Sequence, residues 1–295
     1  VAVDSSTLTP RTMFDDFPAL SLLLLVPAIA AGCKRSIPPP DNPLESPEAL
    51  RGAVQSRMED LRDARFKEVV LEYFGDDRRI KVRQLILVER PDKIRVQTRV
   101  PGTNEIASLL VTDGDTFALH RREDNRYVTG PPTPANIDRL LPVDLSPPDI
   151  VRVMLGGAPW ERFDAQPGTP TLEWDRRRGR YAYRVSTEEG GRLVMNVRPT
   201  DYGVTAVRQI DADGKTVYEY TTDDWERTGS VALPTRRRFV ATDPNVDFSV
   251  DVGETELNVG FPARLFELSP PPGSDVVRVN AAGQTIPADP SGATD

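Results

Sequence analysis

The spacing of hydrophobic residues changes along the chain, and the first regular stretch has the period of a helix. Leu50, Val54, Met58 and Leu61 recur three to four positions apart. This spacing places them on one face of a helix, so we predict a helix with one apolar face over residues 47–62.

From about residue 66 the period changes to two. Residues 79–88 and 93–100 alternate apolar with basic or polar side chains, a pattern typical of an antiparallel sheet with one face in water. Turn signals at Pro91-Asp92 and Asp113-Gly114 divide this region, and we predict about six strands, the sixth ending near Val128. The apolar face of the two alternating strands carries Ile80, Val82, Ile86, Val88, Ile94, Val96 and Val100.

Two short helices are predicted after this first run of strands. Pro134 and Pro147 open them, and Gly156-Gly157 closes the second. A second strand run then follows. Its predicted members are 171–176, 181–186, 192–198, 204–211, 216–224, 235–242 and 247–257.

These elements predict a mainly β fold with a few helices. We expect a single curved antiparallel sheet of about 12 strands, because a sheet of this size must curl. The central helices would bury their apolar faces inside the curl, which gives an unclosed half-barrel capped by helices over residues 45–268. Pro270, Pro271 and Pro272 open a tail rich in Pro, Gly and Ala, and we predict disorder over residues 269–295.

The N-terminal region has the features of an export signal. Residues 17–32 are mostly apolar but too short to cross a membrane, and Ala30, Ala31 and Gly32 precede the chain's only cysteine, Cys33. This segment resembles the lipobox of bacterial lipoproteins, which implies cleavage after residue 32 and lipid attachment at Cys33. The alternative is the signal peptide of a soluble protein with an incidental cysteine.

The residues after the cysteine predict a tether. Residues 33–44 contain three consecutive prolines, 38–40, which favour a semi-rigid extended chain. Lys34 follows the cysteine, and by analogy with enterobacterial sorting it favours the outer membrane, facing the periplasm. Retention in the inner membrane stays open.

Composition limits the chemistry. The net charge of −8 disfavours nucleic acid as a partner, because phosphates need clustered cations. One cysteine and one histidine, His120, provide no disulfide and no Cys/His metal site, and there is no Gly-x-Ser-x-Gly elbow. We therefore predict no metal, no cofactor and no enzyme. In Arg236-Arg237-Arg238, strand alternation places only Arg237 on the opposite face.

One stretch resembles a known family. Residues 87–96 run from strand to loop to strand; Val100-Pro101-Gly102 follows, and residues 109–114 end in an Asp-Gly turn. With the lipobox and the element order, this resembles the LolA/LolB superfamily of periplasmic carriers and outer-membrane receptors of lipoproteins, over roughly residues 45–265. The resemblance implies an unclosed β-barrel with an apolar cavity for acyl chains. Receptor-type members present a leucine on a protruding loop, whereas the matching loop here has Val100, Pro101 and Gly102.

The resemblance leads to one main functional hypothesis and two others. The main hypothesis is a membrane-anchored lipoprotein that binds acyl chains of lipoproteins or lipids in envelope transport. The second is a sensor or interaction module with an envelope protein partner, and the third, an enzyme, is disfavoured. The expected cavity residues, which could equally be plain core residues, are Ile80, Val82, Ile86, Ile94, Val96, Ile150, Met154 and Leu155.

Overall fold

The computed structural model describes residues 36–75, 78–100, 102–103, 105–137, 145–242 and 245–286. Cys33, Pro101 and the segment 138–144 lie outside the described residues. The helices are α1 (Pro47–Ser56), α2 (Pro134–Ile137), α3 (Pro147–Met154) and α4 (Trp160–Asp164), and one 3₁₀ helix spans Ala263–Phe266.

The described strands form one sheet. The first run is β1 (Asp63–Gly75), β2 (Arg78–Glu89), β3 (Lys93–Arg99), β4 (Ile106–Thr112), β5 (Phe117–Arg121) and β6 (Arg126–Gly130). The second run is β7 (Thr171–Asp175), β8 (Arg180–Ser186), β9 (Arg192–Val197), β10 (Val204–Ile210), β11 (Thr216–Thr228), β12 (Val231–Thr242), β13 (Asn245–Asp251) and β14 (Glu254–Leu257). The last strands are β15 (Asp275–Val279) and β16 (Thr285–Ile286).

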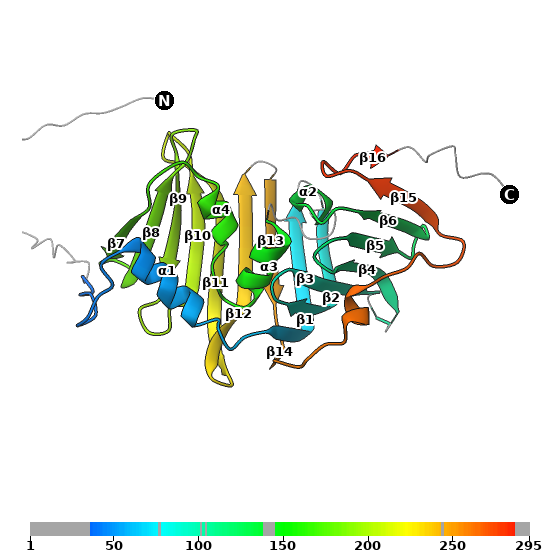
Figure 1. Ribbon diagram of the computed structural model, residues 1–295, viewed down its shortest axis with the longest axis horizontal. Helices are drawn as coiled ribbons and strands as arrows, with labels where there is room; N and C mark the ends of the chain where they lie inside the picture. The colour runs from blue at the N-terminus through cyan, green and yellow to red at the C-terminus, as the bar shows by residue number, and fades with distance from the viewer. Residues whose placement is uncertain are drawn as a thin grey trace, which may run out of the picture. The chain divides into compact units, whose positions relative to one another are not determined.

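Two meanders meet at one seam. Within each run, β1–β6 and β7–β13, neighbouring strands pair antiparallel, and β1 joins the two runs by pairing with β13 from Val70↔Asp251 to Gly75↔Val246. The path ends at β7 and β16, which do not pair with each other, so the sheet is unclosed. Figure 1 shows that the sheet is also strongly twisted, because β7–β13 are vertical in the view and β4–β6 are nearly horizontal.

The predicted fold class is confirmed, but the strand count is higher. The structure describes 16 strands where about 12 were expected. Residues 247–257 divide into β13 and β14, which pair with different parts of β1 on either side of a register shift between Phe66 and Val69. A β-bulge of this kind bends a strand and allows the change of partner.

The prediction of a disordered C-terminal tail was wrong for residues 275–286. β15 pairs parallel with β6, and β16 pairs with β15. Val279 is buried in the main core, and the carbonyl of Asn280 accepts a hydrogen bond from Asn136 Nδ2 at 3.0 Å. A Pro-rich composition suggested disorder, but the pairing with β6 is nonlocal and leaves no local signal.

The described part of the predicted tether contacts the domain. Ile37 N donates to the carbonyl of Arg176 at 2.8 Å, and Trp174 Nε1 donates to the carbonyl of Ile37 at 3.0 Å. Leu44 N donates to Tyr181 Oη at 3.0 Å. Residues 37–44 therefore run beside the β7–β8 hairpin, instead of standing free as the tether prediction implied.

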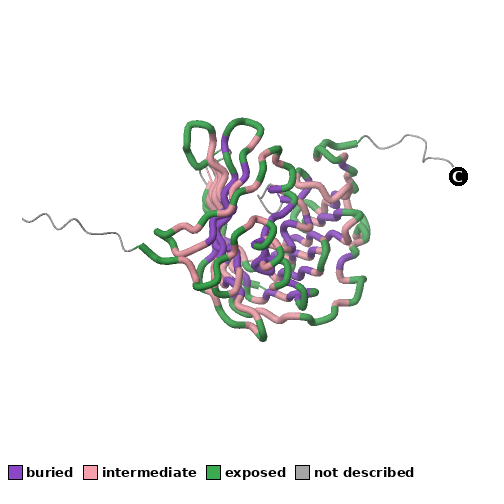
Figure 2. Tube along the Cα trace, turned by 60° about the vertical axis from the view of Figure 1, so that its left-hand side comes forward, coloured by how far each residue is buried: buried purple, intermediate pink, exposed green. Residues whose placement is uncertain are grey.

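The helices lie on one face of the sheet, which we call the inner face. Figure 1 shows α1, α3 and α4 crossing this face. Most buried apolar side chains form one cluster there, and Figure 2 shows buried segments along the strands. The predicted helix over 47–62 is too long, because α1 ends at Ser56 and Met58 and Leu61 lie beyond it. The four apolar residues of the prediction, Leu50, Val54, Met58 and Leu61, are all buried.

Candidate functional site

A small void on the inner face is lined only by apolar side chains. The sheet contributes five of them and the α3 segment four, and the volume is about 30 Å³. A space of that size holds about one or two water molecules and is far too small for an acyl chain. The lining residues are Ile86, Ile94, Phe239, Phe248 and Val250 from the sheet, Ile150, Val153 and Met154 from α3, and Leu145, which lies two residues before α3 and is counted here with the α3 segment.

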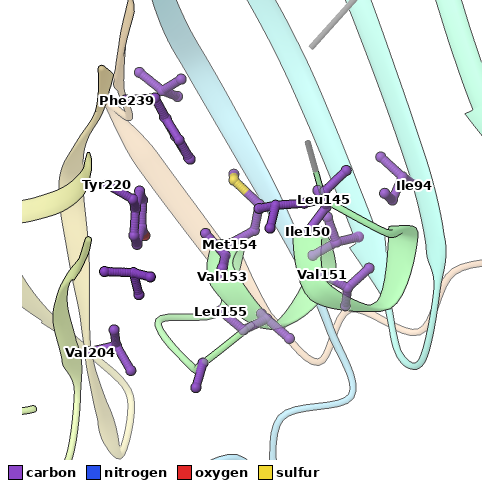
Figure 3. Close-up of a cluster of buried hydrophobic side chains, with 14 of the residues drawn as sticks. Ile94, Leu145, Ile150, Val151, Val153, Met154, Leu155, Val204, Tyr220 and Phe239 are labelled. Carbon is purple, nitrogen blue, oxygen red and sulfur yellow. The ribbon is translucent and has the colours of Figure 1, made fainter. Parts of the chain in front are cut away.

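The α3 segment itself fills the inner face. Figure 3 shows Leu145, Ile150 and Met154 lying between Phe239 on one side and Ile94 on the other. Phe239 stacks on Phe248 with ring centroids 4.6 Å apart, so part of the sheet side of this contact is aromatic. The side chains of Leu145 and α3 therefore leave little free space on this part of the inner face.

The structure brings four of the eight expected cavity residues together. Ile86, Ile94, Ile150 and Met154 line the void. Val96 and Leu155 are fully buried in the surrounding core, and Val82 is half-buried at its margin. Alternation correctly gives the inward face of β2 and β3.

Ile80 is the one residue of the eight that is exposed to solvent. Its side chain is 44% exposed, and it pairs with Tyr73 near the end of the β1–β2 hairpin. It shares the inward face of β2 with Ile86 but lies outside the lining. The alternation predicts a face but not how far along the strand that face is covered.

The loop expected to contact membrane or cargo connects β3 to β4. Val100 is half-buried and its N–H donates to the carbonyl of Glu105 at 2.8 Å. Gly102 is exposed with a φ of +79°, a conformation that glycine adopts without strain. Pro101 lies outside the described residues.

Two arginines hold the C-terminal end of α3. Arg237 Nη2 donates to the carbonyl of Met154 at 2.7 Å, and Arg57 Nη1 donates to the carbonyl of Leu155 at 3.2 Å and of Gly156 at 3.4 Å. Arg57 Nη2 also donates to the carbonyl of Ala232. Cations are favoured here because the last carbonyls of a helix lack partners and carry partial negative charge. The predictions from sequence did not include Arg57, which follows the last residue of α1.

The N-terminal end of α3 is joined to α4. The Asp149 carboxylate is almost fully buried and accepts hydrogen bonds from the backbone N–H of Glu161 at 3.2 Å and of Arg162 at 3.0 Å. Burial raises the pKa of Asp149, and its donors, which include Arg152, oppose that rise. Asp149 thus caps α4, so the two helices are coupled. The sequence prediction missed α4, whose five residues are too few to show periodicity.

Arg237 is the most unusual residue of the inner face. It is completely buried on β12, paired in register with Thr222 and Val250, and its guanidinium lies 5.5 Å from the centroid of Phe66. Within the described part of the chain it forms no ion pair, and its Nε and Nη1 atoms have no hydrogen-bond partner. Arg236 and Arg238 are exposed and paired with Asp251 and Asp247, as the alternation of this strand predicts.

Tyr220 lies beside Arg237. Its hydroxyl is buried and has no hydrogen-bond partner of normal geometry among the described residues. Burial raises the pKa of Tyr220 to about 12, although the nearby positive charge of Arg237 opposes this rise. Arg237 lies close enough to Tyr220 for its charge to act on the tyrosine hydroxyl.

The raised pKa of Tyr220 predicts a loss of stability at high pH. An unfolded tyrosine loses its proton near pH 10, whereas folded Tyr220 keeps its proton to about pH 12. Between these values the folded state binds more protons, so the free energy of unfolding falls by about 1.4 kcal/mol per pH unit. Chemical denaturation at pH 9, 10 and 11 checks this. Tyr220→Phe should remove that part of the slope, and an unchanged slope would contradict the prediction.

Two larger hollows are polar. One, of about 490 Å³, lies where α3 meets α4 and includes Asp149, Glu161, Arg162 and Gln209. The other, of about 570 Å³, lies over β1–β3 and includes Arg83, Arg95 and Arg99. Neither resembles an acyl-chain site in its lining.

Two features that would point to other functions are absent from residues 36–286, apart from the undescribed gaps. No three His, Cys, Asp or Glu side chains there converge on a possible metal position. No helix described in that range has the length and apolar character needed to cross a bilayer. His120 is half-buried and bonds with Asn125 at 3.1 Å, apart from the inner face void.

Comparisons with known proteins identify the fold. Neither a protein-family model nor a curated protein matches the sequence. Solved structures do match: a domain assigned to the outer membrane lipoprotein-sorting proteins, from Vibrio parahaemolyticus, has a TM-score of 0.55 at 8% identity, covering 74% of this chain and 94% of that one.

Two further solved structures have a similar fold. A DUF1329 family protein from Desulfovibrio piger has a TM-score of 0.56 at 12% identity, covering 76% of this chain and 98% of that chain. A LolA superfamily protein from Nitrosomonas europaea has a TM-score of 0.51 at 10% identity, covering 76% and 99%. The unclosed sheet with helices on its inner face is therefore a LolA/LolB-like fold.

Proposed function

We propose that the chain is a lipid-anchored envelope protein that binds acyl chains of lipoproteins or lipids on its inner face, in envelope lipoprotein or lipid transport. The anchor would be Cys33, and Lys34 favours the outer membrane, facing the periplasm. The role is binding without covalent chemistry. The observation that carries the proposal is the wholly apolar lining of the void between the α3 segment and the sheet, to which the α3 segment contributes four side chains.

Binding would proceed by exchange. Withdrawal of α3 would uncover Ile86, Ile94, Phe239, Phe248 and Val250, and an acyl chain would take the place of the helix side chains. Burying about fifteen methylene groups contributes about 12 kcal/mol, and the four displaced side chains account for about 6–12 kcal/mol. These similar magnitudes favour reversible exchange between helix and ligand.

The sensor or interaction module remains a second candidate, and a specific observation favours it. A protein that never takes a ligand would have its inner face filled by its own side chains, and the void of about 30 Å³ fits that description. An envelope protein would then be the partner.

Mass spectrometry separates these candidates. The full chain purified from a bacterial envelope fraction is expected to show a lipid modification on Cys33 under denaturing conditions. A Cys33→Ser form of the full chain, purified without detergent, is expected to carry a discrete noncovalent mass of a lipid or acylated peptide under native conditions. A clean apo mass, with no uptake of an added fatty acid, would overturn the acyl-binding proposal and favour the interaction module.

A further inference from the structure

The positive charge of Arg237 has no compensating negative charge among the described residues while α3 lies on the inner face. A fully buried guanidinium without a carboxylate is costly, because the charge has lost its water. Among the described residues its one hydrogen-bond acceptor is the carbonyl of Met154, and its Nε and Nη1 donors are unused.

That acceptor belongs to the element that would have to move. Met154 is the last residue of α3, so withdrawal of α3 removes the carbonyl from Arg237. A purely hydrocarbon ligand would then surround the guanidinium with apolar groups and supply no acceptor. A ligand that replaces α3 must therefore bring its own acceptor to this position, and a negative charge fits best.

The neighbours of Arg237 show where the rest of such a ligand would lie. Val250, which lines the void, pairs with Arg237 across the β12–β13 ladder. Phe239, two residues along β12, also lines the void and pairs with Tyr220. The unused donors of Arg237 and the Tyr220 hydroxyl thus lie at one end of an apolar surface. This arrangement matches a carboxylate joined to a hydrocarbon chain.

We propose that Arg237 and Tyr220 form a carboxylate-binding site, and that the ligand of the inner face is a long-chain fatty acid. This inference rests on the proposed acyl-binding function and specifies its ligand class. The fatty acid's carboxylate takes the place of the Met154 carbonyl, and its chain takes the place of the side chains of α3. A compact carboxylate suits the position better than a bulky phospholipid head group, because Arg237 is enclosed by the sheet and Phe66.

Competition binding tests the inference on the full chain carrying Cys33→Ser. Nile red, a neutral dye, is bound first and then displaced by palmitate or by 1-hexadecanol, which has the same chain length and no charge. Palmitate is expected to bind at least tenfold more tightly than 1-hexadecanol. Arg237→Met is expected to reduce this ratio to near one, mainly by weakening palmitate.

Arg236→Met is the matched control, because Arg236 is the adjacent, exposed residue of the same strand and faces away. It should leave the ratio unchanged. Tyr220→Phe keeps the aromatic core and removes one donor, so it should lower the ratio several-fold. If Arg237→Met does not fold, the inference is tested by the ratio of palmitate affinity to 1-hexadecanol affinity, measured for Tyr220→Phe and for the Cys33→Ser chain itself.

The outcomes are distinct. If neither ligand displaces the dye or binds on its own, the acyl-binding function and this inference both fail. If both ligands bind with equal affinity, acyl binding stands and the carboxylate site is overturned. Preference for palmitate that survives Arg237→Met would also overturn it.

Discussion

Replacing Arg57 with methionine is expected to lower the stability of the protein and, at the same time, to tighten its binding of acyl ligands. Arg57 donates hydrogen bonds to the carbonyls of Leu155, Gly156 and Ala232, and so it holds the end of α3 against the β11–β12 hairpin. Hydrogen bonds from a charged group contribute about 1.5–3 kcal/mol each, and we expect a net loss of about 2–4 kcal/mol. Methionine keeps the apolar stem of the side chain and removes the donors.

The gain in affinity follows from competition. In the proposed exchange, α3 occupies the place that the ligand would take, so any substitution that weakens the packing of α3 raises the fraction of protein able to bind. A shift of about 1.4 kcal/mol toward the open form would tighten ligand binding about tenfold. Thermal unfolding and Nile red displacement measure the two effects on the same samples.

Arg83→Met serves as the control for this prediction. Arg83 lies exposed on the outer face of β2 and forms no ion pair with the described residues. Arg83→Met should change neither the stability of the protein nor its affinity for acyl ligands by much. If Arg57→Met lowered stability and affinity together, Arg57 would be a support for the core and not a restraint on α3.

The second large effect is expected for Ile94→Glu. Ile94 is completely buried on the inward face of β3 and lines the void beside α3. A carboxylate there has no partner, and we expect a cost of about 4 kcal/mol or more. At about 2–4 °C per kcal/mol, the unfolding midpoint should fall by roughly 8–16 °C. Bound lipid should be lost from the native mass spectrum of any folded fraction.

Ile80→Glu is the matched comparison, because it makes the same change on the same face of the sheet. Ile80 is 44% exposed, so its carboxylate would remain in water and we expect a change within about 1 kcal/mol. Equal losses for the two variants, measured by thermal unfolding, would contradict the placement of Ile80 outside the lining.

Local periodicity predicted the parts of the fold that depend on one strand or one helix at a time. The alternation in β2 and β3 correctly gave the inward face, with Ile86, Ile94 and Val96 buried, and the alternation in β12 put Arg237 opposite Arg236 and Arg238. Helical spacing likewise predicted α3. Each of these patterns expresses which face of an element meets the core.

Pairings between distant segments had no comparable signal. β15 joins β6 across about 150 residues, and α4 owes its N-terminal cap to Asp149 of another helix. The sequence around Arg237 does not predict that its hydrogen-bond acceptor is a helix carbonyl instead of a carboxylate. The extent of the cover over β2, which leaves Ile80 exposed, also depends on elements far away in the sequence.

The seam between β1 and β13 has a consequence for how the chain matures. Residues 70–75 must wait for residues 246–251, which are synthesised about 175 residues later, before their second edge is paired. Contacts of such long sequence separation form slowly, and an unpaired strand edge invites association with other chains. We therefore expect the first meander to depend on chaperones until residues 246–251 are available to pair with β1.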